Sequence, residues 1–181
     1  MARQRKVKRT PVRVSIIKED CDAHKKLYRA LRKIIEDHHP DLKRARIVLA
    51  YREGWRPNAD GQVTLAKVQR PNEAMRKLSG ADAIILLNRQ ALARNDFSPA
   101  MRDALLDHEC CHLSESLDSQ GEPKLDADGN PLFRVRRGHD MEEFVAVVQR
   151  HGKWTAALAR FGETLSKAKD LTTPLLNAAG Q

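Results

Sequence analysis

The stretch DHECCHL (residues 107–113) contains two histidines four positions apart, with a glutamate directly after the first. Residues four apart on a helix lie one above the other on the same face. If this stretch is helical, His108 and His112 can present their imidazoles to one metal ion, and Glu109 points toward the same edge of the helix. The stretch therefore predicts a metal site built on a helix.

This spacing, H-E-x-x-H, is the minimum needed for metal-assisted peptide hydrolysis. Zinc held by protein ligands, with one position left for water, lowers the pKa of that water to about 7. A carboxylate beside it, here Glu109, can take the proton as the water attacks a carbonyl group. The simpler alternative is that the two histidines bind no metal and have only a structural role. Two imidazoles on a core-facing stripe would then need other polar partners.

A third metal ligand has to come from another part of the chain, and the best candidates lie in GHDMEEF (residues 138–144). His139 is favoured because imidazole is a common zinc ligand. Glu143 lies one turn further on the same face and could bind the metal or orient an imidazole, and Asp140 or Glu142 rank behind it. Alternatively, the carboxylates only complement the dipole of a helix N-terminus, which explains them but not the histidine.

Three cysteines, an odd number, make a poor disulfide framework and favour a reducing compartment. Cys110 and Cys111 occupy the variable positions of the motif. Helical geometry turns them away from the histidine face, so they are expected to be small packing residues. A thiolate ligand at either position would require the helix to distort.

The remaining pattern predicts an α+β domain, with helices packed on a small mixed or antiparallel sheet of about three to four strands. The motif helix spans residues 97–117 and begins with Ser98 as N-cap and Pro99 at its first position. Other helices are expected at 20–40, 139–152 and 153–170, and Asp20 or Asp22 is expected to cap the first of them. Strands are expected at 45–52, 62–70 and 81–88. The first two strands should pair as a hairpin, and AIILLN (83–88) could offer an edge to an extended substrate. Residues 118–138 are turn-rich and indicate a hairpin or loop excursion with a short strand, LFRVR.

The net charge of +9 is concentrated at the start of the chain, in Arg3, Arg5, Lys6, Lys8 and Arg9. A basic arm at residues 1–10 could bind nucleic acid by releasing counterions from phosphates, or it could be a disordered, solubilising terminus. The folded domain is expected at residues 11–170, followed by a flexible tail at 171–181. The longest apolar run, residues 83–87, is too short to span a bilayer, and no secretory signal is evident, so a cytoplasmic protein without a membrane partner is expected.

Two segments, LLDHECCHL (105–113) and GHDMEEFVAVVQRHGKW (138–154), resemble the phage metallopeptidase family of bacteriophages and prophages. The resemblance implies a zincin-like fold, a small sheet whose edge strand runs beside the motif helix, and a protein or peptide substrate inside a bacterial cell. It also implies His108 and His112 as zinc ligands, Glu109 as the catalytic base, and His139–Asp140 as the second motif of the family.

The chain is also broadly similar to SprT-like proteases, which cut proteins crosslinked to DNA. Their compact HExxHxxxxH spacing is absent, because position 117 is Leu117 and His139 lies 27 residues after His112. The alternative to a zinc peptidase is a non-catalytic DNA-associated or regulatory protein with a structural zinc site. A structural site would not require Glu109, whereas a peptidase would.

Overall fold

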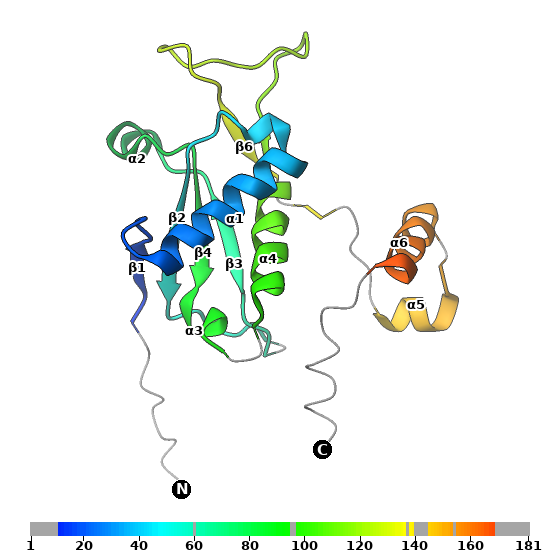
Figure 1. Ribbon diagram of the computed structural model, residues 1–181. Coiled ribbons are helices and arrows are strands. Elements are labelled where there is room, and N and C mark those ends of the chain that lie inside the picture. Colours follow the sequence, from blue (N-terminus) through cyan, green and yellow to red (C-terminus); the bar gives the residue numbers. More distant parts are fainter. Residues whose placement is uncertain are drawn as a thin grey trace, which may run out of the picture. The chain divides into compact units, whose positions relative to one another are not determined.

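The computed structural model describes residues 11–59, 61–94, 97–136, 138–139, 145–153 and 155–168 (Figure 1). It divides into two units, residues 1–136 and residues 137–181. The predicted basic arm and the whole of the predicted flexible tail lie outside the described residues. The domain bounds expected from the sequence therefore stay a prediction.

The first unit is built on a mixed sheet of four strands in the order β1-β2-β4-β3. The strands are β1 (Arg13–Ile16), β2 (Ile47–Glu53), β3 (Ala66–Gln69) and β4 (Ala83–Asn88). β4 runs parallel to β2 and antiparallel to β3, while β1 runs antiparallel to β2. With the helices that accompany it, this sheet confirms the predicted α+β class.

The two segments expected to pair as a hairpin, 45–52 and 62–70, are not neighbours in the sheet. β4 lies between β2 and β3 and pairs with both. Five of its six residues are buried, as is typical of a central strand covered on both faces. The prediction that residues 83–88 offer an edge is therefore wrong. Among the described residues, the edge on that side of the sheet belongs to β3.

Helices α1 (Asp22–His38) and α4 (Pro99–Cys111) pack against each other, and α4 also lies along β3 (Figure 1). Their apolar stripes share one core with the inner face of the sheet; its fully buried members include Leu31, Leu49, Ile85, Leu87, Leu106 and Cys110. The start of α4 is as predicted, because the Ser98 hydroxyl accepts from the Met101 amide and Pro99 is the first helical residue. At α1 the N-cap position is Cys21, which makes no side-chain cap, so the predicted Asp20 or Asp22 cap is wrong.

Helix α4 is shorter than the predicted helix at 97–117, because it ends at Cys111 with His112 as its C-cap. β5 (Leu113–Glu115) follows directly and pairs antiparallel with β6 (Phe133–Val135), which confirms the predicted short strand and hairpin excursion. His108 thus lies in the last turn of the helix and His112 at its C-cap, where the chain continues into β5.

The excursion between β5 and β6 contains two turns of the same kind. In each, an aspartate carboxylate accepts hydrogen bonds from the amides two and four residues later: Asp118 from Gln120 and Glu122, and Asp126 from Asp128 and Asn130. These are Asx turns. The Arg76 guanidinium forms ion pairs with Asp126 of the second turn and with the buried Asp82. Arg76 therefore links this turn to the segment that precedes β4.

The other elements of the first unit are short: the 3-10 helix η1 (Pro40–Leu42), α2 (Glu73–Ser79) and α3 (Arg89–Leu92). The second unit contains α5 (Val145–His151) and α6 (Ala156–Lys167). Gly152, with φ of 67°, follows α5 as a helix stop, and the Thr155 hydroxyl caps α6 by accepting from the Leu158 amide. No helix within the described residues is long and apolar enough to cross a membrane.

Candidate metal centre

The two histidines of the motif meet at the end of α4. The Nε2 atoms of His108 and His112 are 3.3 Å apart, and their rings lie edge to face with an interplanar angle of 80°. Zinc–nitrogen bonds of about 2.0–2.1 Å in tetrahedral geometry separate two ligand nitrogens by about 3.3–3.4 Å. The pair therefore already has the separation that one tetrahedral ion requires.

His112 is held in position by two hydrogen bonds to Arg136, the residue that follows β6. The Arg136 amide donates to the His112 carbonyl over 2.7 Å, and the Arg136 carbonyl lies 2.9 Å from the Nδ1 atom of His112. Because a carbonyl can only accept, Nδ1 carries the hydrogen and Nε2 keeps its lone pair for a metal. The position at the helix end makes this possible, since the carbonyls of a last turn have no partner within the helix.

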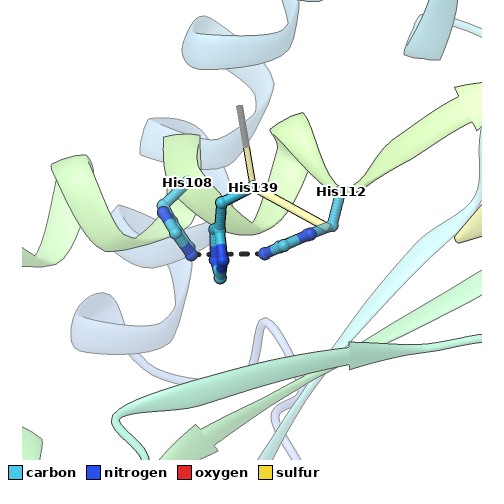
Figure 2. A group of neighbouring side chains, drawn as sticks. All are labelled: His108, His112 and His139. Atoms are coloured by element: carbon cyan, nitrogen blue, oxygen red, sulfur yellow. Dashed lines mark hydrogen bonds between the residues drawn. The ribbon is translucent and has the colours of Figure 1, made fainter. Parts of the chain in front are cut away.

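His139 joins this pair. One ring nitrogen from each of His108, His112 and His139 lies within 4.8 Å of the other two (Figure 2). Chain connectivity contributes to this proximity: His139 is three residues beyond Arg136, and three residues span at most about 11 Å. The other candidates for a third ligand, Asp140, Glu142 and Glu143, lie outside the described residues.

The Glu109 side chain lies on the buried side of α4 and is only 4% exposed. Its Oε2 atom accepts a hydrogen bond of 2.7 Å from the Val68 amide. In the antiparallel pair of β3 and β4, alternate residues of β3 direct their main-chain groups away from β4, and Val68 is one of these. The carboxylate is therefore anchored in the seam between α4 and the outer edge of β3, an arrangement that sequence reasoning missed.

The two cysteines of the motif behave differently. Cys110 is fully buried in the core, and burial raises the pKa of its thiol to about 12, so it stays protonated near neutral pH. This confirms its predicted packing role. Cys111 is exposed, so the same prediction for Cys111 is wrong. The helical period predicts that neither cysteine lies on the face of α4 that carries His108 and His112. It does not predict which of the two cysteines faces the core.

The comparisons with known proteins give one match. Residues 19–166 match the model of a family described as "Putative phage metallopeptidase". The chain belongs to this family. The matched range contains every residue of the histidine cluster and Glu109. No curated protein and no solved structure matched the chain.

Membership of a metallopeptidase family implies a metal ion and a protein substrate. The three histidines are a donor set that fits such an ion: three nitrogen ligands converge, and two of them already stand at a tetrahedral separation. The resemblance drawn from residues 105–113 and 138–154 is confirmed by the family match, and the name of the family points to a phage origin.

Proposed function

We propose that this protein is a zinc-dependent metallopeptidase in which His108, His112 and His139 hold the ion and Glu109 acts as the catalytic base. The observation that carries the proposal is the convergence of three imidazole nitrogens within 4.8 Å of one another in a member of a metallopeptidase family. Three protein ligands leave one coordination position open, which is the pattern of catalytic rather than structural zinc sites.

Zinc bound there would supply Lewis-acid chemistry, making water acidic enough to lose a proton near neutral pH. The protein's own groups do the rest. The His112 ring is oriented by the Arg136 carbonyl, which keeps Nε2 directed at the cluster. Glu109 takes the proton from the attacking water at a carboxylate oxygen and returns it to the departing amine. Its position is fixed by the hydrogen bond that Oε2 accepts from the Val68 amide.

An extended peptide substrate is best placed along β3. This strand, and not residues 83–88, forms the sheet edge beside α4. The Val68 amide is already bonded to Glu109, so the other outward-facing main-chain groups of β3 are the ones that can align a substrate backbone. Glu109 stands at the same edge. The substrate, the metal and the base are then brought together along one seam.

The alternative, a DNA-associated or regulatory protein with a structural zinc site, draws its support from the basic arm at residues 1–10, which lies outside the described residues. A structural site does not need a carboxylate directly after its first histidine, whereas a peptidase does. The place of Glu109 in H-E-x-x-H, together with the family match, therefore favours the peptidase.

The metal content of the purified full-length protein tests the proposal. Elemental analysis should find zinc in the wild type and a loss of about one equivalent in both His112→Ala and His139→Ala. His38→Ala serves as the matched control, because His38 is an exposed histidine of α1 outside the cluster. If His112→Ala loses the metal while His139→Ala keeps it, the third ligand is Glu143 or a neighbouring carboxylate. Wild-type protein that takes up no zinc at this site, even when refolded with it, contradicts the peptidase proposal.

A further inference from the structure

A second group of metal-ligating side chains lies beside α4 in the first unit: His39, Asp107 and Cys111. The Nε2 atom of His39 is 2.6 Å from a carboxylate oxygen of Asp107. One ligand atom from each of the three residues lies within 4.8 Å of the other two. The His39 side chain is only 12% exposed, while Cys111 reaches the surface.

Two of these residues have the same four-residue spacing as the histidine pair. Asp107 and Cys111 are four residues apart on α4 and each directly precedes one of the motif histidines, so the helix carries two adjacent ligand pairs on neighbouring faces. His39 comes from the C-cap position of α1, where its amide is fixed by a hydrogen bond to the Ile35 carbonyl. Because α1 packs on α4, the cluster forms only in the folded chain.

We propose that His39, Asp107 and Cys111 form a second metal site, for an ion of the zinc or cobalt class, distinct from the histidine cluster. Imidazole and thiolate ligands select such ions over magnesium or calcium, which prefer oxygen ligands alone. The ion takes the place of the hydrogen between His39 and Asp107. The neutral imidazole then carries its hydrogen on Nδ1 and binds through Nε2, and the thiol of Cys111 releases its proton to solvent. Three protein ligands leave a fourth position for water.

The distances agree with this assignment. Around a tetrahedral zinc-like ion, neighbouring nitrogen, oxygen and sulfur ligands lie about 3.3–3.8 Å apart. His39 and Asp107, now in hydrogen-bond contact, have to separate by less than about 1 Å, and an exposed cysteine side chain can adjust by rotation. The contact between His39 and Asp107 already joins the two helices, and the Cys111 thiol adds a third ligand atom within 4.8 Å of both.

A third group, Asp20, Cys21 and His24, is a weaker candidate. All its members come from five consecutive residues at the exposed start of α1, and the Nδ1 atom of His24 is already shared between the Lys18 carbonyl and Asp20. In the other cluster, His39 and Asp107 are 68 positions apart in sequence, and His39 is largely buried. A metal ion there would connect the end of α1 to the last turn of α4.

Cobalt titration of the metal-free, full-length protein tests the proposal, with reduced cysteines and a phosphine reductant that does not compete for metal. A thiolate ligand to cobalt gives a charge-transfer band in the near ultraviolet that imidazole ligands do not give. We expect the wild type to bind two equivalents, one of them with this band. Cys111→Ser should lose the band and one equivalent, and His39→Gln should lose one equivalent. His38→Gln, at the adjacent exposed position, should behave as the wild type.

The variants separate this proposal from the peptidase. His112→Ala should lose the other equivalent and keep the charge-transfer band. If the band is present but His112→Ala changes nothing, the second site stands and the histidine cluster fails. A wild type without the band overturns the second site and leaves the peptidase intact. A band that survives Cys111→Ser but disappears in Cys21→Ser also overturns it, because the thiolate site is then the one at Asp20, Cys21 and His24.

Discussion

The amide of Val68 donates a 2.7 Å hydrogen bond to the carboxylate of Glu109, and this contact joins the outer edge of β3 to the helix that carries the motif. The two residues are 41 positions apart in sequence. A buried carboxylate is costly unless its oxygens accept hydrogen bonds. The edge strand supplies a donor, the Val68 amide, to this carboxylate. The same contact fixes the side chain proposed as the catalytic base.

Glu109→Gln should abolish most hydrolysis without removing the metal or the fold. The amide oxygen of glutamine can still accept from Val68, but it cannot take a proton from water. Loss of a general base costs about 10²–10⁴-fold in rate. The measurement is kcat/KM on an unfolded protein substrate, with zinc content and Tm determined on the same preparation. Retention of full activity removes Glu109 from the mechanism.

Glu109→Ala should instead lower stability. Truncation leaves the Val68 amide without its acceptor in a buried seam, which costs about 1–3 kcal/mol in the free energy of unfolding. Urea unfolding of the wild type, Glu109→Gln and Glu109→Ala measures the difference. An alanine variant as stable as the glutamine variant shows that the hydrogen bond contributes nothing to folding.

Hydrogen exchange at Val68 provides an independent check of this contact. The Val68 amide should exchange slowly in the wild type and in Glu109→Gln, and much faster in Glu109→Ala, because only alanine removes the acceptor. The amide of Ala66 faces the same way from β3 and is the internal reference, with the same exchange rate in all three proteins. Equal acceleration at both positions would indicate general loosening of β3 instead.

Arg76→Ala should destabilise the first unit. The Arg76 guanidinium is largely buried and lies between Asp82 and Asp126, so its removal leaves Asp82, which is 7% exposed, without its closest cation. We expect a loss of about 2 kcal/mol in the free energy of unfolding. Lys77→Ala is the matched control, because Lys77 forms an exposed pair with Glu73 and its loss should stay within about 0.5 kcal/mol. Comparable losses in the two variants contradict the structural role of Arg76.

The three cysteines should differ in reactivity toward an alkylating reagent. Cys21 and Cys111 are exposed, whereas Cys110 is buried with the pKa of its thiol raised to about 12. Because the thiolate is the reactive form, Cys110 should stay unmodified in the native protein from pH 7 to about 9 and react only after denaturation. Mass spectrometry of intact and digested protein assigns the labels. Native labelling of Cys110 would place it outside the core.

What the sequence by itself determined is local. The spacing of His108 and His112, the start of α4 at Ser98 and Pro99, and the turns within residues 118–138 are examples. Each depends on residues that lie close together in the sequence. Backbone geometry fixes such relationships before any tertiary contact forms. The motif and the family could therefore be recognised from the residues alone.

The tertiary structure decided which distant segments meet. β4 rather than β3 became the neighbour of β2, because the most apolar strand is buried at the centre of the sheet. That order left β3 at the edge and brought Val68 to Glu109. The end of α4 at Cys111 depends on the contact of its C-cap His112 with Arg136, which follows β6. The approach of His39 to Asp107 depends on helix packing, and no local pattern encodes either contact.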